Sequence, residues 1–358
     1  MKSYDIARIP GDGIGQEVTP AACAVLEAVG KRHGIVFRWR PFDWSCARLK
    51  AEGAMMPQDG ISQLSGMDAI LLGAVGFPGV ADHESLWGLL IPLRRGLQQY
   101  VNLRPVRLMP GIQSPLVGRS GADIDFLIVR ENSEGEYSDI GGRFADGTPA
   151  EAAFQTSVFT RAATDRIMRY AFDLAGKRSA KHVTSATKSN GMKHTMPFWD
   201  ERFAAISAEY PDIATSQYHI DILTAHFVSH PDWFDVVVAS NLFGDILSDL
   251  GPAIAGSIGI APSANINPER DYPSMFEPVH GSAPDIAGKG IANPVAAIWS
   301  GAMMLDHLGE KDAASDVEAA MEKALLRSDC LTPDLGGPAD TKGMTRAVLD
   351  NLSGSGAA

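Results

Sequence analysis

Short apolar runs alternate with amphipathic stretches along most of the chain. The runs of strand length are YDIARI, DAILLGAVG, DFLIVREN, KHVTSATKSN and DVVVASN. Several are apolar at consecutive positions, which is typical of strands buried on both faces of a helix-covered sheet. Residues 18–34, 161–178 and 312–327 repeat apolar positions at helical spacing and are predicted helices. This alternation of strands and helices predicts an α/β fold.

Residues 134–153 break the pattern. The segment reads EGEYSDIGGRFADGTPAEAA and is rich in glycine and polar residues. This composition predicts a loop or a projecting hairpin rather than part of the core. An oligomerisation arm and an ordinary surface loop explain the segment equally well at this level.

The composition narrows the class of protein. A chain of 358 residues, 45% hydrophobic and 21% charged, is ordinary for a globular protein of about two domains. The net charge of −12 argues against a nucleic-acid partner. The three cysteines are widely spaced, and no apolar stretch has the length of a signal peptide or a membrane span. We therefore expect a cytoplasmic protein with no structural zinc and no membrane partner.

A glycine-rich turn, IPGDGIGQE, lies between the first predicted strand and helix. Its glycines, Gly11, Gly13 and Gly15, have the spacing GxGxG and not the GxGxxG of Rossmann folds. The next candidate strand, GIVFRWRPFD, is a poor fit to the strand whose end carries the ribose-binding acid in such folds. A tight structural turn is at least as good an explanation as a dinucleotide site. No P-loop motif is present.

Arginines that could bind carboxylates follow predicted elements. Arg94 ends the helix-like ESLWGLLIPLRR, Arg104 lies in VNLRPV, and Arg130 ends DFLIVR. Arginine binds carboxylates with two parallel hydrogen bonds, and ligands in α/β folds sit at the carboxyl ends of strands. Each arginine taken alone is more often a surface ion pair, so these positions indicate a small anionic ligand only as a set.

Two carboxylates interrupt the apolar stretch NLFGDILSDLGPAIAG. Asp245 and Asp249 lie one helical turn apart and would share one face, where like charges repel. One explanation for Asp245 is that it lies near the N-terminus of a helix capped by Asn241, where the helix dipole favours a negative charge. One explanation for Asp249 is that it lies on a solvent-exposed face of the helix. Asp221 also has apolar neighbours in YHIDILTAHF. A shared Mg²⁺ or Mn²⁺ would explain all three, because these ions prefer oxygen ligands.

Proton-transfer groups occur in two other segments. Lys188 follows a predicted strand in TSATKSNGMKH, beside Asn190, and Tyr137 lies in ENSEGEYSD. A lysine there could be a general base or a solvated charge, and a tyrosine could be a proton donor or a packed ring.

The segment MFEPVHGSAPDIAGKGIANP combines two glycine-rich turns with His280, Asp285 and Asn293. Backbone N–H groups in such turns can hold phosphates. Asp285 could accept hydrogen bonds from a ribose diol and would repel a 2′-phosphate, which favours NAD over NADP.

The order of these motifs resembles the β-decarboxylating dehydrogenases, which include isocitrate, isopropylmalate and tartrate/D-malate dehydrogenases. The resemblance runs from GDGIG through NLRP, TKSN and GDILSDL to EPVHGSAPDIAGKGIANP. Trp87 stands where isopropylmalate enzymes carry a glutamate. The form DHESLWGLL, with INPERDYPSMFEPVHGSA, is similar to the tartrate/D-malate branch. An isocitrate dehydrogenase is disfavoured because Asp285 stands where the NADP-dependent enzymes of the family carry a lysine that recognises NADP.

The resemblance implies a two-domain α/β fold, not a Rossmann fold, in which one sheet is shared between the domains. It assigns residues 1–100 and 252–358 to a large NAD-binding domain. Residues 101–251 would form a small domain for substrate binding and dimerisation, with an arm near 134–153.

The resemblance also implies the following site, in a homodimer. Lys188 and Asp221 would reach the site of the other subunit. Lys188 would take part in deprotonating the substrate hydroxyl, and Tyr137 would protonate the product. The remaining assignments are substrate binding by Arg94, Arg104, Arg130, Asn190 and Asp221, metal binding by Asp221, Asp245 and Asp249, and NAD binding by Ile14, His280, Gly281, Ser282, Ala283, Pro284, Asp285 and Asn293.

The expected function is NAD-dependent and Mg²⁺- or Mn²⁺-dependent oxidation of a (2R)-hydroxy dicarboxylate, with K⁺ as an optional activator. D-malate would give pyruvate and CO₂, and a tartrate could also be oxidised. The alternative within the family is 3-isopropylmalate dehydrogenase, for which Leu89, Leu90 and Ile91 could form an apolar pocket. A non-catalytic subunit would be expected to lose Tyr137 or Lys188, and a phosphoryl-transfer enzyme would need a phosphate-binding loop.

Overall fold

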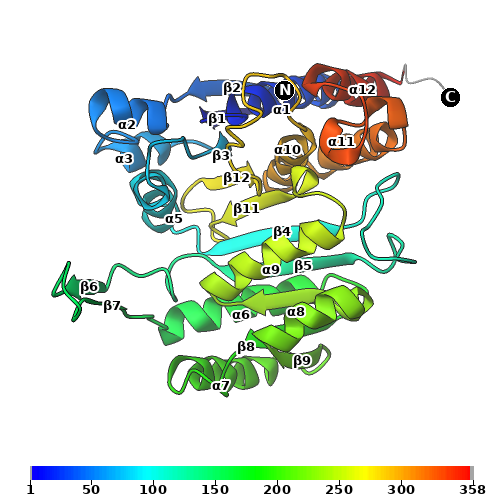
Figure 1. Cartoon of the computed structure of the whole chain (residues 1–358). Helices are drawn as coiled ribbons and strands as arrows, with labels where there is room; N and C mark the ends of the chain where they lie inside the picture. The colour runs from blue at the N-terminus through cyan, green and yellow to red at the C-terminus, as the bar shows by residue number, and fades with distance from the viewer. Residues whose placement is uncertain (1, 355–358) are drawn as a thin grey trace.

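The computed structural model describes residues 2–354, which build around one ten-stranded mixed sheet (Figure 1). The strand order is β2-β1-β3-β12-β11-β4-β5-β10-β8-β9. These strands are β1 (Lys2–Gly11), β2 (Ile35–Pro41), β3 (Ala69–Ala74), β4 (Val101–Arg107), β5 (Asp125–Glu131), β8 (His182–Thr187), β9 (Ala214–His219), β10 (Val236–Ala239), β11 (Pro262–Ile266) and β12 (Ser274–Pro278).

Helices cover both halves of the sheet. Around the half that contains β1 lie α1 (Gly15–His33), α2 (Cys46–Glu52), α3 (Gly60–Leu64), α4 (Asp82–Ser85), the π-helical turn η1 (Leu86–Leu90), α5 (Ile91–Gly96), α10 (Val295–His307), α11 (Lys311–Leu325) and α12 (Thr341–Ser353). Around the half that contains β5 lie α6 (Arg161–Ala175), α7 (Thr195–Ser207), α8 (Ile220–Ser229) and α9 (Asn241–Ile254). Short 3₁₀ turns are η2 (Pro231–Trp233), η3 (Ile258–Ile260), η4 (Ser328–Cys330) and η5 (Pro333–Leu335).

The five predicted strands and the three predicted helices are confirmed, as β1, β3, β5, β8 and β10 and as α1, α6 and α11. GIVFRWRPFD, a poor fit to the acid-bearing strand of a Rossmann fold, nevertheless contains a strand, because Ile35–Pro41 forms β2 and pairs in parallel with β1. β2 lies at the edge of the sheet, and its exposed positions alternate with half-buried ones after the buried Ile35, so it lacks the apolar run of an inner strand.

β3 shows why inner strands are apolar at every position. Ala69 and Leu71 belong to the large core under α1 and α10, whereas Ile70 and Leu72 belong to a second core with Leu93 of α5. Successive side chains of a strand point to opposite faces, so both faces of this half of the sheet are buried. The second core fixes the helix that carries Arg94 against the sheet.

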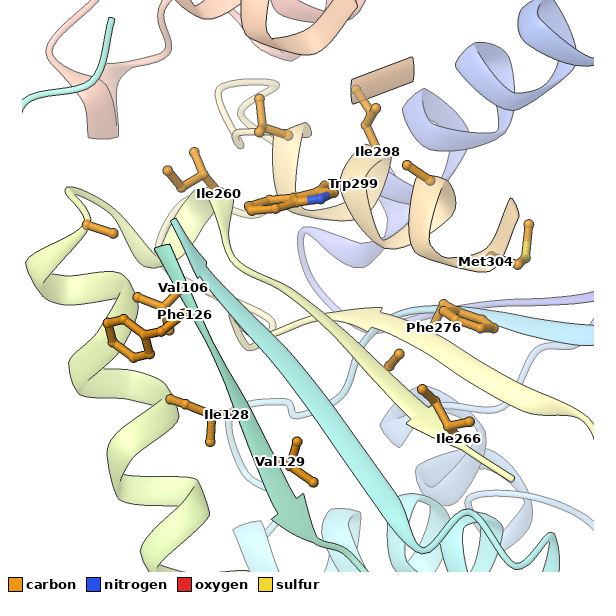
Figure 2. Close-up of a cluster of buried hydrophobic side chains, with 14 of the residues drawn as sticks. Val106, Phe126, Ile128, Val129, Ile260, Ile266, Phe276, Ile298, Trp299 and Met304 are labelled. Atoms are coloured by element: carbon orange, nitrogen blue, oxygen red, sulfur yellow. The ribbon is translucent and has the colours of Figure 1, made fainter. Parts of the chain in front are cut away.

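The two halves of the sheet meet at the antiparallel pair β11–β4. Strands on one side come from residues before 75 and after 261, and strands on the other side from residues 101–239. Figure 2 shows that apolar packing is continuous across this junction, from Phe126 and Ile128 of β5 to Phe276 of β12 and Trp299 of α10. The sheet shared between domains, expected from the family resemblance, is confirmed.

A two-stranded hairpin begins within residues 134–153 and ends at Gln155, as one of the two interpretations predicted. β6 (Gly141–Phe144) pairs antiparallel with β7 (Ala152–Gln155), and the hairpin projects from the body of the molecule (Figure 1). Phe144 and Phe154 are 57% and 60% exposed. Large exposed aromatic side chains on a projecting hairpin are typical of a segment that packs against another molecule.

Within residues 2–354, no helix combines the length and apolar character that crossing a membrane requires. Cys23, Cys46 and Cys330 are buried and form no disulfide with one another.

The ionisation of the half-buried His307 should couple to the stability of the folded state. His307 ends α10 against Phe276, and burial, together with the charge of Arg270, lowers its pKa from 6.5 to about 4. The unfolded chain therefore takes up this proton first as the pH falls, so stability is lost between pH 6.5 and pH 4.

We predict that His307→Gln flattens this dependence. Between pH 7.5 and pH 4.5 the wild-type protein should lose roughly 2–3 kcal/mol more free energy of unfolding than the variant does. Urea denaturation at a series of pH values measures the difference. Equal pH slopes in the two proteins would contradict it.

Candidate active site

A cavity of about 190 Å³ lies where the two halves of the sheet meet. It is lined by Gly73, Ala74, Val75, Leu86, Leu90, Arg94, Arg104, Arg130, Tyr137, Asp245, Glu277, Pro278, Val279, His280 and Gly281. The cavity therefore brings together the three predicted arginines, one predicted aspartate, the predicted tyrosine and the start of the predicted NAD segment.

Arg94 reaches the cavity from α5, which continues α4 through the π-helical turn η1. Leu86 and Leu90 line the cavity from the same continuous helix, whereas Leu89 and Ile91 are buried in the protein interior. The Arg94 guanidinium donates to Glu277 on β12 at 3.1 Å. Among the described residues its Nε has no hydrogen-bond partner, so one buried donor is free for a ligand.

Arg104 and Arg130 come from the neighbouring strands β4 and β5. Arg130 is 1% exposed, and it donates to Asn241 Oδ1 through Nε (3.2 Å) and Nη2 (2.7 Å) and to Asp245. Burial, with the nearby charge of Arg130, lowers the pKa of Arg104 to about 10, so it keeps its charge at neutral pH. The Arg104 Nε also has no partner within residues 2–354. Both arginines are thus buried cations, and Arg104 retains an unpartnered donor for an anion.

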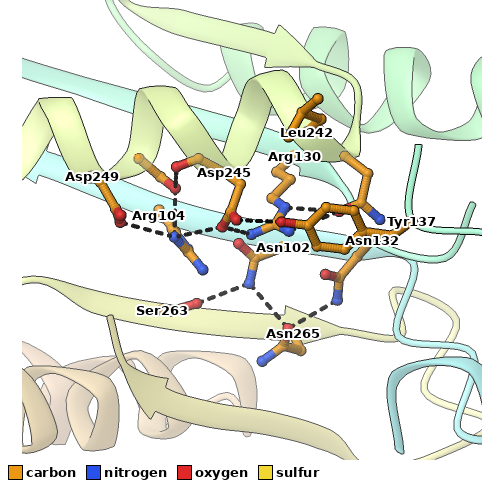
Figure 3. Close-up of polar contacts among 12 residues, drawn as sticks. Asn102, Arg104, Arg130, Asn132, Tyr137, Leu242, Asp245, Asp249, Ser263 and Asn265 are labelled. Carbon is orange, nitrogen blue, oxygen red and sulfur yellow. Dashed lines mark hydrogen bonds and ion pairs between the residues drawn. The ribbon is translucent and has the colours of Figure 1, made fainter. Parts of the chain in front are cut away.

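Asp245 and Asp249 project from one face of α9 toward these arginines (Figure 3). Nη1 of Arg104 lies 3.7 Å from Asp245 and 3.8 Å from Asp249, so a guanidinium relieves the repulsion that the sequence indicated. Burial raises the pKa of Asp249. The pKa of Asp245 is lowered, because Arg130 and Arg104 outweigh its burial. The pair retains oxygen atoms suited to a hard divalent cation.

The start of α9 differs from the expected one. Asn241 is the first residue of the helix and Ser240 is its N-cap, so the prediction of Asn241 as N-cap was wrong. Its side chain instead accepts the hydrogen bonds from Arg130. Gly244 allows this approach, because a Cβ there would lie 2.5 Å from Cγ of Arg130.

Tyr137 closes one side of the cavity from the loop between β5 and β6. Its hydroxyl donates to Asp245 Oδ2 at 2.6 Å, and its ring lies against Arg130, 5.4 Å from the guanidinium carbon. Burial and this hydrogen bond raise the pKa of Tyr137, so the phenol is protonated at neutral pH. Neighbouring Glu136 holds the loop to α9, accepting from Ser240 Oγ (2.7 Å) and Leu242 N (3.1 Å).

The glycine-rich turn and the His280–Asp285 segment form one unit. The N–H of Ile14 donates to the carbonyl of Ser282 at 2.9 Å. Gly13 has a φ of +53°, and a Cβ there would lie 2.0 Å from the same carbonyl. The GxGxG spacing therefore serves a tight contact between two loops, as the structural explanation predicted.

The rest of the expected NAD segment has mixed surroundings. His280 is buried, burial lowers its pKa, and its Nε2 has no partner among the described residues, which leaves a polar atom for a ligand. Gly281, Pro284 and Asp285 are exposed, and Ala283 has a φ of +41°. Asn293 is buried and donates to Asp334 at 3.0 Å. An open turn with a buried free nitrogen fits a nucleotide better than a closed surface loop would.

Lys188 and Asp221 do not reach this cavity in the same chain. They bind each other, with Nζ 2.8 Å from Oδ1, and the Asp221 side chain is 67% exposed. The apolar setting inferred for Asp221 was wrong within one chain, because Ile222 beside it is also exposed. Asn190 is exposed in the turn after Lys188. No group of three metal-ligating side chains forms within residues 2–354, so the metal triad is incomplete in one chain.

Several residues that line the cavity were not predicted from the sequence, among them Glu277 and Leu86. Glu277, in FEPVHG, pairs with Arg94, and Leu86 extends the apolar wall. An acid in an otherwise apolar strand was a usable signal for Glu277. Nothing in the local pattern marked Leu86, because the π-helical turn changes the face to which each side chain points.

Comparison with known proteins identifies the class. The family model described as isocitrate/isopropylmalate dehydrogenase matches residues 5–349. The fold is similar to the crystal structure of isocitrate dehydrogenase from Methylococcus capsulatus, with a TM-score of 0.89, 36% identity and coverage of 98% of this chain and 99% of that one. The chain belongs to the isocitrate/isopropylmalate dehydrogenase family and is an oxidoreductase.

Two other relatives are more similar in sequence. D-malate dehydrogenase [decarboxylating] of Escherichia coli (strain K12) is 57% identical over 97% of this chain and 98% of its own length. Tartrate dehydrogenase/decarboxylase of Pseudomonas putida is 56% identical over 98% of each chain. The resemblance to the tartrate/D-malate branch is confirmed.

Proposed function

We propose that the protein oxidises a (2R)-hydroxy dicarboxylate with NAD and a divalent metal, and releases CO₂ from the oxidised product. D-malate would give pyruvate, and a tartrate is the other candidate substrate. The observation that carries the proposal is the set of three buried arginines around one small cavity, beside an acidic pair and a protonated tyrosine. The names of the two relatives support the same substrates.

The arginines account for recognition of a dicarboxylate. Arg94, Arg104 and Arg130 converge from three elements, and the unpartnered Nε atoms of Arg94 and Arg104 are donors among the described residues. Charge-assisted hydrogen bonds to carboxylates are among the strongest polar contacts in proteins. A cavity of about 190 Å³ has room for a four-carbon acid. Of the three residues considered for an isopropyl pocket, only Leu90 lines it.

The donors for a metal ion would be Asp245 and Asp249, with Asp221 of a second subunit. When bound, Mg²⁺ or Mn²⁺ supplies electrostatic stabilisation of negative charge on the substrate oxygens. The side chains fit such an ion because they are carboxylates one helical turn apart.

NAD would be bound by the Ile14 turn, the segment 280–285 and Asn293. The exposed Asp285 would face a ribose diol. NAD, when bound, accepts the hydride. His280 and Gly281 line the cavity and would bring the nicotinamide end of the segment to the substrate.

Two side chains would move protons. Lys188 of a second subunit would accept the proton of the C2 hydroxyl, where Asn190 could also contact substrate. Tyr137 would donate its proton to C3 after CO₂ leaves. Its raised pKa keeps the proton available at neutral pH, and Asp245 holds the hydroxyl at 2.6 Å.

The active assembly would be a homodimer in which each site receives Lys188 and Asp221 from the other chain. The outer sides of α8 and α9 support this, since Ile222 is 45% and Ile246 47% exposed. Exposed apolar residues beside a paired Lys188 and Asp221 are explained by a second copy of the chain that covers them.

The hairpin near residues 134–153 would act as an arm in this dimer. Residues 1–100 with 252–358 and residues 101–251 would be the two domains, in a cytoplasmic protein.

The test is a comparison of kcat/KM for D-malate, L- and meso-tartrate, 3-isopropylmalate and isocitrate with NAD and Mn²⁺, with and without K⁺. D-malate or a tartrate should be preferred by at least about tenfold. Preference for isopropylmalate would favour the alternative, and absence of NADH formation from every substrate would overturn the proposal.

We predict that Asp245→Asn lowers kcat by about 100-fold or more, because one metal charge and the partner of Arg130 and Tyr137 are lost together. Steady-state NADH formation with Mn²⁺ titrated upward measures the effect. A matched control is Asp316→Asn, a surface carboxylate on α11 paired with His33. Near wild-type turnover of Asp245→Asn would refute the metal assignment.

Tyr137→Phe should separate the two halves of the reaction. Conversion of added oxaloacetate to pyruvate should fall about 100-fold, since a general acid is lost, while NADH formation in a pre-steady-state burst changes little. Pyruvate and NADH are quantified separately. Equal loss in both measurements would contradict the role of Tyr137 in protonation.

A further inference from the structure

Arg95 follows Arg94 on α5 but does not line the cavity. Its exposed side chain crosses to the Tyr137 loop, donating from Nε to the carbonyl of Ser133 at 3.2 Å and from Nη2 to the carbonyl of Tyr137 at 2.6 Å. We propose that Arg95 is a positioning residue that holds Tyr137 in its proton-donating place. The proposal rests on the proposed function, because it concerns the step assigned to Tyr137.

The geometry of the contact suits arginine in particular. A guanidinium carries donors in a planar fork, so it can bind two carbonyl groups of one loop at once, which a lysine ammonium on a flexible stem does less well. The guanidinium carbon also lies 5.2 Å from the centroid of the Trp87 ring. The ring restricts the side chain on one side, as cation–π contacts do. Trp87 thus supports Arg95 and is absent from the cavity wall.

The loop is held from a second side by α9. Glu136 accepts hydrogen bonds from Ser240 and Leu242 at the start of that helix, and the Tyr137 hydroxyl reaches Asp245 one turn further on. Gln155 of β7 adds a third contact, donating to the carbonyls of Glu136 (2.9 Å) and Ser138 (3.2 Å), so the backbone of Tyr137 is fixed between α5, α9 and β7. Without Arg95, the α9 contacts remain but the carbonyl of Tyr137 loses its only side-chain donor within residues 2–354.

The effect should fall on protonation and spare hydride transfer. Arg104 and Arg130 are carried by strands β4 and β5, and Arg94 is anchored by Glu277, so the carboxylate-binding groups do not depend on the loop. Of the cavity side chains assigned a role here, only Tyr137 belongs to the loop. A misplacement of a reacting group by about 1 Å can lower a rate by up to about 100-fold.

The experiment compares Arg95→Ala and Arg95→Lys with the wild-type protein. Arg32→Ala is the matched control, since Arg32 on α1 is 55% exposed and also donates to a backbone carbonyl, that of Leu352. For Arg95→Ala we expect conversion of oxaloacetate to pyruvate to fall about tenfold or more, with the NADH burst within about twofold of wild type. Arg95→Lys should be intermediate, and Arg32→Ala should match wild type.

A double variant separates positioning from general stabilisation. If Arg95 acts through Tyr137, adding Arg95→Ala to Tyr137→Phe should cause no further loss of oxaloacetate decarboxylation, because groups acting through one another are not additive. Multiplicative losses, or equal losses in both partial reactions, would overturn the proposal. If Arg95→Ala does not fold, Arg95→Lys carries the same comparison.

Amide hydrogen exchange tests the same contact without any substrate. Amides of Ser133, Glu134 and Gly135 are hydrogen-bonded within the loop region, at 2.9, 2.9 and 2.8 Å. Arg95→Ala should raise exchange in a peptide covering residues 132–140, whereas Arg32→Ala should leave it unchanged. Unchanged exchange would overturn the proposal. If the wild type forms no NADH, the proposed function fails, and exchange still decides whether Arg95 holds the loop.

Discussion

Buried arginine side chains constrain the structure around the cavity. Removing a guanidinium from water costs several kcal/mol unless acceptors surround it. Arg130 is almost fully buried, and its acceptors, Asn241 and Asp245, are on α9. The need to pair this cation therefore determines how α9 lies over β4 and β5. The close approach is possible because residue 244 is glycine.

The same pairing determines the electrostatics of the site. Three guanidinium groups face three carboxylates, those of Asp245, Asp249 and Glu277, so the unliganded cavity is close to neutral. A dianionic substrate alone would leave an excess of negative charge. A dianion together with a divalent cation would preserve the balance, which is a physical reason for the two to bind together.

One chain provides only part of the proposed chemistry. The cavity contains groups that bind carboxylates and donate a proton, but Lys188 is paired with Asp221 on an exposed surface. The adjacent sides of α8 and α9 present apolar residues to solvent. A fold that shares its sheet between two domains and leaves such a surface open is suited to completing its sites across a subunit interface.

The sequence by itself determined the α/β class, five inner strands and three long helices, because consecutive apolar runs and helical periodicity are local properties. Family-specific motifs also indicated the arginines, Tyr137 and the aspartate pair. Tertiary structure decided how these residues combine. It placed β2 and the short strands β11 and β12 in the sheet, where long-range pairing outweighs local pattern. It also paired Asp245 with Arg130 and brought Arg95 into contact with the loop that carries Tyr137. These contacts join residues that are distant in the chain, so the local sequence pattern does not reveal them.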